Sequence, residues 1–200
     1  MKVPNARMRD DPTIAPGQRP NEMTHSMDDA TKVQLARGEV LVGTEPVAGS
    51  SSPRIVVRAV IEAPPEAVWK HIDQASRYSE FMPRVKKAEE ISRNGDIIRT
   101  RMTVDMPFPL KNLTATTRAR HIVEPGVRWA REWKLEEGDY HVNEGAWVMT
   151  PFDGNPQRTY VHYQVLVVPK IPIPKAIQSA VQEKAMPKLI ESLRQRVKGG

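Results

Sequence analysis

The chain has 200 residues, of which 39% are hydrophobic and 27% charged, and its formal net charge is +6. This length indicates one domain with its own core plus a tail. The absence of cysteine excludes disulfides, a thiol nucleophile and a zinc–thiolate site. No apolar run approaches the roughly 18 residues of a membrane span, and the first twenty residues lack the apolar segment of a secretory signal. We therefore expect a soluble cytoplasmic protein.

The N-terminal part predicts a tail and a short extension. Residues 1–27 are rich in Pro, Asn, Asp and Arg without any period, which predicts disorder, and Met23 or Met27 is an alternative start to Met1. From Asp28, the run DDATKVQLARG predicts a short capped helix that ends at Gly38. A strand follows in GEVLVGTEPV, and AGSSSP is a flexible connector. We assign residues 28–52 to this extension and residues 53–198 to the main domain.

The main domain opens with a strand and two helices. Residues 54–62, RIVVRAVIE, are β-branched and alternate as a strand does. Residues 63–66, Ala-Pro-Pro-Glu, then start a helix with proline in its first turn and a carboxylate near its positive end. A second short helix is expected at residues 77–82, before Pro83.

Six strand-like segments follow, joined by short turns. Asn94-Gly95 is a strong hairpin signal, and Glu124-Pro125-Gly126 suits a turn. Links this short make neighbouring strands antiparallel partners. The predicted strands cover residues 85–92, 96–105, 113–123, 127–135, 144–151 and 159–168.

The last segment predicts a long amphipathic helix from Pro174 to Val197. Apolar residues recur every fourth position from Ile177 through Val181 to Leu193. Pro187 interrupts the pattern, so two helices end to end are possible, but we favour one bent helix lying on a curved sheet. The predicted fold class is α+β: a seven-stranded antiparallel sheet wrapped around this helix, with two short helices after the first strand.

Alternate turns of a meander lie at the same end of the sheet, so the 106–110 loop, the 136–143 loop and the 169–174 link should meet. Two of them are apolar and rich in proline, where turns are normally polar. They either pack on one another as a plug or form the rim of a cavity that admits an apolar ligand or touches a membrane. The side chains concerned are Phe108, Leu110, Ile171 and Ile173, with Lys111, Lys170 and Lys175 beside them.

The segment VVRAVIEAPPEAVWKHIDQASRYSEFMPRVKKAEEI resembles the opening of the START-like superfamily, also called the polyketide cyclase/dehydrase and lipid-transport (SRPBCC) superfamily. The resemblance covers about residues 53–197 and is carried by residues 63–69 (Ala-Pro-Pro-Glu-x-Val-Trp), Asp73, and residues 78–83, with 133–135, 143–147 and 159–163 in agreement. The chain looks most like the bacterial branch related to coenzyme-Q-binding START proteins. The resemblance implies a helix-grip fold that binds lipids, isoprenoid quinones or polyketides between sheet and helix. Some relatives are cyclases, and others are ribosome-association toxins.

The sequence shows few of the parts that catalysis needs. None of the five histidines has metal-ligand spacing, and there is no Gly-rich phosphate loop, so we expect no metal and no cofactor. The candidate acid–base residues are His162, Tyr163, Asp105 and Glu144, and they form no evident constellation. We therefore favour a non-catalytic carrier of a hydrophobic small molecule, with a polyketide cyclase/aromatase as the alternative.

Arg131 is the most informative polar residue, because strand alternation places it on one face with Trp129 and Trp133. A buried guanidinium needs a partner. Either Arg131 makes a structural ion pair or it anchors a polar ligand head. Tyr163 could likewise contact a ligand or be a core tyrosine. The full set of expected ligand-binding residues is Trp69, Phe81, Met102, Phe108, Leu110, Trp129, Arg131, Trp133, Trp147, Tyr163, Ile173, Ile177 and Val181.

Residues 82–134 hold twelve Lys or Arg against six Asp or Glu. This excess could attract nucleic acid or anionic lipid, but no aromatic–basic RNA motif accompanies it, so solvent-facing strand residues are the favoured interpretation. Nucleic acid and the ribosome are therefore disfavoured as partners. We expect a monomer that touches anionic membranes transiently.

Overall fold

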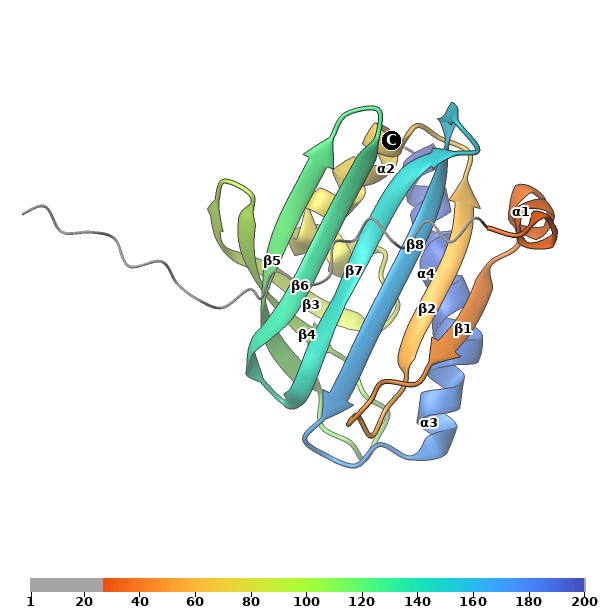
Figure 1. Ribbon diagram of the computed structural model, residues 1–200. Coiled ribbons are helices and arrows are strands. Elements are labelled where there is room, and N and C mark those ends of the chain that lie inside the picture. The colour runs from red at the N-terminus through yellow and green to blue at the C-terminus, as the bar shows by residue number, and fades with distance from the viewer. Residues whose placement is uncertain (1–26, 200) are drawn as a thin grey trace, which may run out of the picture.

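The computed structural model describes residues 27–199, so residues 1–26 of the predicted tail lie outside the described part. An eight-stranded antiparallel sheet with the order β1-β2-β8-β7-β6-β5-β4-β3 forms the body of the domain (Figure 1). The strands are β1 (Leu41–Glu45), β2 (Arg54–Ile61), β3 (Val85–Asn94), β4 (Ile97–Val104), β5 (Leu113–Glu124), β6 (Arg128–Gly138), β7 (Tyr140–Phe152) and β8 (Asn155–Pro169).

The prediction of seven strands is wrong by one, because the extension joins the sheet. β1 pairs with β2 from Leu41↔Arg58 to Glu45↔Arg54. β2 needs this partner, since without it the backbone groups on its outer edge would be unpaired. Beyond the end of β1, Arg194 of the C-terminal helix supplies hydrogen bonds to the outer edge of β2. Its Nε and Nη2 donate to the Val60 carbonyl at 3.1 and 2.7 Å.

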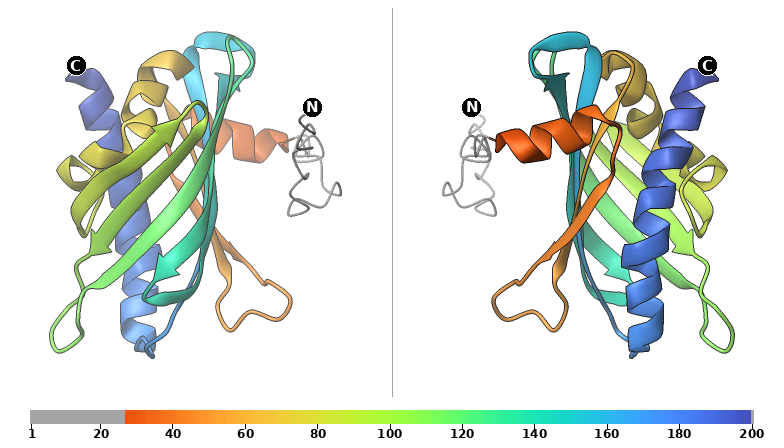
Figure 2. Two further views of the ribbon diagram at one scale, coloured as in Figure 1. Left: turned by 90° about the vertical axis from the view of Figure 1, so that its left-hand side faces the viewer. Right: turned by 90° about the vertical axis from the view of Figure 1, so that its right-hand side faces the viewer.

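The helices lie on both sides of the sheet. The concave face carries α2 (Pro65–Asp73), the 3-10 helix η2 (Ala75–Glu80) and the long C-terminal helix, whereas α1 (Asp29–Ala36) lies on the opposite side (Figure 2). α1 is capped as predicted, since the Asp28 side chain accepts from the Thr31 amide. It contributes Leu35 to a small cluster with Val60 and Phe152. The predicted helix-grip arrangement, a sheet wrapped around a long C-terminal helix, is confirmed.

The C-terminal helix is continuous but changes its winding before Pro187. It consists of α3 (Lys175–Ala180), the π-helical turn η3 (Val181–Ala185) and α4 (Met186–Lys198). In the π turn the Met186 amide donates to the Val181 carbonyl. Since proline lacks the N–H that would bond the carbonyl four residues back, a wider turn just before it relieves the conflict. One helix with a local irregularity therefore replaces the alternative of two separate helices.

The two ends of this helix are buried to different extents. Leu189, Ile190 and Leu193 of α4 are buried in the main core, whereas α3 and η3 contain no buried residue. The helix is thus packed tightly on the sheet along α4 and more loosely along α3 and η3.

The three segments expected to meet do so in a further cluster at the loop end. Ile171 and Ile173 of the β8–α3 link and Met106 of the β4–β5 loop pack with Tyr140, Leu113 and Ala115. The 136–143 segment is not an irregular loop, however, because β6 and β7 run through it with only Asp139 between them, although their pairing with one another ends at Trp133↔Gly145. Asp139 is held by Thr114, whose amide donates to the Asp139 carboxylate at 2.7 Å.

No helix within residues 27–199 is long and apolar enough to cross a membrane. The domain boundaries at residues 27/28 and 52/53 stay predictions.

Candidate functional site

The concave face of the sheet keeps an accessible apolar surface at its α3 end. Its residues are packed against the main core but are only partly buried. We call this surface the half-accessible patch; it comprises Val85 and Ala88 of β3, Met102 of β4, Trp133 of β6, Val181 of η3 and Met186 of α4. Half-accessible apolar side chains facing inwards between two layers are typical of a ligand-binding interior.

The opposite end of the same face is filled by side chains. Trp147, Met149 and Val161 are at most 1% exposed, and they share a cluster with Leu189 and Leu193 of α4. α2 contributes Val68 and Ile72, both fully buried. The apolar interior is therefore packed most tightly where Leu189 and Leu193 of α4 meet the sheet, and less tightly beside η3.

A chain of polar side chains enters this interior from the β3 edge. Arg131 is 2% exposed; its Nη1 lies 2.7 Å from His121 Nε2, and its Nη2 donates to Thr100 Oγ1 at 3.0 Å. His121 Nδ1 lies 3.1 Å from Asp73 Oδ1. Asp73 in turn accepts from Arg93 at 2.8 Å at the half-exposed edge of the sheet.

The geometry fixes the protonation state of His121. Its Nε2 faces a guanidinium, which only donates, so Nε2 must accept and the ring must be neutral with the proton on Nδ1. Burial, with the positive charge of Arg131 next, lowers the pKa of His121 to about 4. Burial also lowers the pKa of Arg131 from its usual value and raises that of Tyr78, whose ring lies under the guanidinium, to about 12.

Within residues 27–199, Arg131 has protein partners but no carboxylate in direct contact. Two of its nitrogens are engaged by His121 and Thr100, and its charge is balanced through His121 by Asp73. Of the two interpretations of Arg131, a structural network describes these contacts better than a ligand anchor. Its assignment as a ligand residue stays a prediction.

The thirteen expected ligand residues fall into three groups. Met102, Trp133 and Val181 belong to the half-accessible patch, and Trp69 is also half-buried against the core. Phe81, Trp129, Trp147 and Tyr163 are buried core residues, as Arg131 is. Ile173 packs in the cluster at the loop end, Leu110 and Ile177 are half-exposed outside the main core, and Phe108 is 97% exposed.

Sequence reasoning missed the polar network and part of the patch. Asp73, His121 and Thr100 were not among the expected site residues, nor were Val85, Ala88 and Met186. A signal for His121 was present: counting outwards from the turn at Pro125-Gly126 pairs Glu124 with Arg128 and therefore His121 with Arg131, as the register shows.

Several basic residues of the segment 82–134 are ion-paired on the convex face. Arg99 contacts Glu136 at 2.7 Å and Arg120 contacts Asp96 at 3.1 Å. Similar pairs join Arg101 to Glu137 and Arg128 to Glu132. This pattern fits the interpretation of solvent-facing strand residues.

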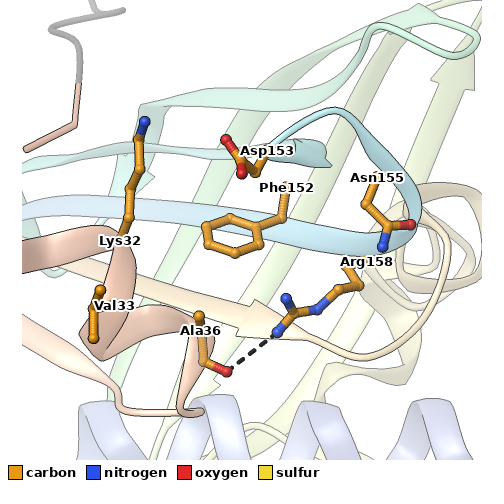
Figure 3. Close-up of a pocket in the computed structure, with 7 residues that line it drawn as sticks. All are labelled: Lys32, Val33, Ala36, Phe152, Asp153, Asn155 and Arg158. Carbon is orange, nitrogen blue, oxygen red and sulfur yellow. Dashed lines mark hydrogen bonds between the residues drawn. The ribbon is translucent and has the colours of Figure 1, made fainter. Parts of the chain in front are cut away.

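An open hollow of about 430 Å³ lies on the outside of the sheet, between α1 and the β7–β8 turn (Figure 3). Arg158 at its floor is already engaged by Glu62 and donates to the Ala36 carbonyl at 3.3 Å. The hollow is separate from the concave face. Among residues 27–199 no three His, Asp or Glu side chains are placed to hold a metal ion together.

Comparison with known proteins agrees with this geometry. The chain matches the family model for polyketide cyclase / dehydrase and lipid transport proteins over residues 61–194. No curated protein sequence matches the chain. The fold is similar to that of the STAR-related lipid transfer protein from Xanthomonas axonopodis, at 15% identity and a TM-score of 0.69, covering 80% of this chain and 93% of the other.

Two further solved structures show the breadth of the fold. Human StAR-related lipid transfer protein 5 has 13% identity and a TM-score of 0.70, with 81% of this chain and 83% of the other covered. The Zhui aromatase/cyclase from Streptomyces sp. R1128 has 16% identity and a TM-score of 0.57, with 72% and 93% covered. Identities this low show the common fold alone. The family match spans more than half of the sequence, and the chain therefore belongs to the polyketide cyclase / dehydrase and lipid transport family.

Proposed function

We propose that the protein binds and carries a hydrophobic small molecule between the concave face of the sheet and the α3–η3 segment. The observation that carries this proposal is the contrast along the C-terminal helix: α4 buries Leu189, Ile190 and Leu193 in the main core, whereas α3 and η3 contain no buried residue and Val181 is only partly buried. Leaving large apolar side chains such as Met102 and Trp133 incompletely buried forgoes part of the roughly 1.5–3 kcal/mol that full burial of such a side chain provides. A bound apolar ligand would supply the missing contacts.

A carrier role is favoured over a cyclase role by the positions of the candidate acid–base residues. Tyr163 faces the concave interior, whereas His162 and Glu144 lie on the convex face, and Glu144 contacts Arg54 at 3.5 Å. Asp105 lies at the end of β4, 3.6 Å from Arg84. General acid–base catalysis needs its groups within hydrogen-bond reach of one substrate, and these four residues do not share one site.

We further propose that the loop end of the domain contacts anionic membranes during ligand exchange. Phe108 is 97% exposed at the tip of the β4–β5 loop. Three lysines of the loop end are exposed: Lys111 in the same loop, Lys170 in the β8–α3 link and Lys175 at the start of α3. Each basic residue near an anionic surface contributes about 1 kcal/mol of attraction. The cytoplasmic location, the monomeric state and a coenzyme-Q-type ligand stay predictions.

Native mass spectrometry of the purified full-length protein tests the carrier proposal. We expect one apolar molecule to remain bound per chain, or to be taken up from a total lipid extract and to exclude a second equivalent. A chain that neither retains nor takes up any component of the extract would contradict the proposal.

A further inference from the structure

Three aromatic side chains form a continuous wall on the concave face. Tyr163 of β8 packs against Trp147 of β7 with ring centroids 4.3 Å apart, and Trp133 of β6 stacks on Tyr163 at 6.1 Å with an angle of 26° between the planes. Trp147 and Tyr163 are directly opposite one another in the β7–β8 ladder. Trp133 is instead opposite Gly145, which lies two residues before Trp147 on β7. Its ring must therefore reach across β7 to stack on Tyr163.

Two features hold the Trp133 ring in this position. Its cross-strand partner is Gly145, and a Cβ on Gly145 would lie 2.5 Å from Trp133 Cζ2, so the ring lies where any other residue would place a side chain. The indole Nε1 donates to Asn143 Oδ1 at 3.1 Å. Trp133 is thus fixed before any ligand arrives, and its one polar atom is already satisfied.

Trp133 is also the accessible member of the wall. Trp147 and Tyr163 are 1% and 6% exposed, whereas Trp133 is only half-buried and belongs to the half-accessible patch. Its neighbours in the cross-strand row are Ala119 and Gly145, which are too small to cover the ring. A ligand that reaches Trp133 would therefore meet an aromatic ring of fixed orientation.

The polar groups of the interior add a second restriction on the ligand, which concerns its charge. Arg131 is engaged by His121 and Thr100, and the charges of Arg131 and Arg93 are matched by Asp73 and Glu90. The interior network is neutral as a whole without a ligand. An anionic head group would disturb this balance and would lose its hydration on entry.

We propose that Trp133 is a specificity-determining residue, a preformed stacking platform that selects neutral ligands with a planar conjugated ring over saturated or acidic molecules of the same size. This inference rests on the proposed carrier function and narrows its ligand class. Aromatic pairs contribute about 0.5–1.5 kcal/mol beyond their area of contact, which corresponds to a preference of roughly two- to ten-fold.

Matched probes test the inference. The planar probe is 9-anthracenemethanol, the puckered probe is its perhydro analogue with the same carbon skeleton, and the acidic probe is 9-anthracenecarboxylate. We expect the wild-type protein to bind the planar alcohol two- to ten-fold more tightly than the puckered one, and the carboxylate to bind at least ten-fold more weakly than the planar alcohol. The planar alcohol is followed by energy transfer from tryptophan and the other two by competition.

Three variants complete the test. Trp133→Leu should lose the preference for the planar alcohol while binding the puckered alcohol within two-fold of wild type. Asn143→Ala removes the hydrogen bond that orients the Trp133 ring, so it should lose part of this preference. Val33→Ala, at the outer hollow and outside the patch, is the control and should keep the preference. Equal binding of both alcohols by the wild type, or a Trp133→Leu variant that weakens both equally, would overturn the inference but leave the carrier function intact. Failure of the wild type to bind any probe would overturn both.

Discussion

His121 Nε2 lies 2.7 Å from Arg131 Nη1 inside the domain, and this contact holds only while the imidazole is neutral. A protonated ring would set an N–H against a guanidinium N–H, and two positive charges would share one buried site. Asp73 stabilises the neutral tautomer by accepting from Nδ1 at 3.1 Å. The protonation state of His121 therefore makes the stability of the interior depend on pH.

Stability should fall in acid because of His121. Its pKa in the folded protein is about 4, below the value of about 6.5 in an unfolded chain. Below pH 6.5 the unfolded chain binds a proton at His121 that the folded protein does not bind until the pH reaches about 4. The contribution of His121 to the free energy of unfolding is therefore fully present above pH 6.5 and is lost progressively as the pH falls to about 4. We expect His121 alone to lower the free energy of unfolding by on the order of 2 kcal/mol between pH 7.5 and 4.5.

Urea unfolding of wild type and His121→Gln at both pH values isolates this contribution. Glutamine offers an acceptor and a donor but does not titrate, and all other groups are the same in both proteins. The loss of stability between the two pH values should be smaller in the variant by about 2 kcal/mol. Equal losses would show that His121 is not held neutral.

Arg131→Met distinguishes the two interpretations of the buried guanidinium. Because His121 and Thr100 would each lose a hydrogen-bond partner in a buried site, we expect the free energy of unfolding to fall by about 2–3 kcal/mol. The affinity for a neutral apolar probe should change less than two-fold. A stable variant with strongly weakened binding would instead make Arg131 a ligand anchor.

The outline of the fold could be predicted from the sequence because its signals are local. Strand alternation in β2, the turn residues at Asn94-Gly95 and Glu124-Pro125-Gly126, and the apolar stripe of the last helix each act within a few residues. The pairing of β1 with the sheet and the extension of β6 and β7 through residues 136–143 depend on contacts with distant segments, so they could not be predicted, whereas Pro187 did mark the irregularity in the last helix.

The candidate site could be predicted from the sequence only where the alternation of side chains along a strand decides on which face of the sheet a residue lies. Alternation correctly placed Trp133 and Arg131 on one face, and both lie on the concave side. Whether an inward side chain is fully buried depends on what covers it, and that is set by the helix above the sheet. The sequence therefore could not separate Trp147, which is 1% exposed, from the half-accessible Trp133.

Gly145→Ala should destabilise the protein. The new methyl group would lie 2.3 Å from the Gln164 carbonyl oxygen of β8 as well as against the Trp133 ring, so a paired strand or a stacked indole must move. We expect a loss of about 1–3 kcal/mol in the free energy of unfolding. Gly43→Ala in β1 is the control, since a Cβ there meets nothing within 4 Å and stability should be nearly unchanged. Similar stabilities of both variants would show that Trp133 does not occupy the space above Gly145.

Phe108 and Ile171 should respond differently to aspartate. Phe108 is 97% exposed, so Phe108→Asp should leave the melting temperature unchanged, whereas Ile171 packs in the loop-end cluster and Ile171→Asp should lower it by several degrees. Phe108→Asp should also slow the transfer of a fluorescent lipid from anionic vesicles. An unchanged transfer rate for a folded Phe108→Asp variant would contradict the proposed membrane contact.

The location of a bound apolar molecule tests the central claim most directly. A neutral probe that carries a photoactivatable diazirine on a short alkyl chain is bound to the full-length protein and irradiated, and the labelled residues are identified by peptide mass spectrometry. We expect the labels to concentrate on the half-accessible patch, above all at Met102, Trp133 and Val181, and to disappear when excess unlabelled probe is present. Labels confined to the outer hollow around Val33 and Phe152, or to Phe108 alone, would contradict a binding site between the sheet and the α3–η3 segment.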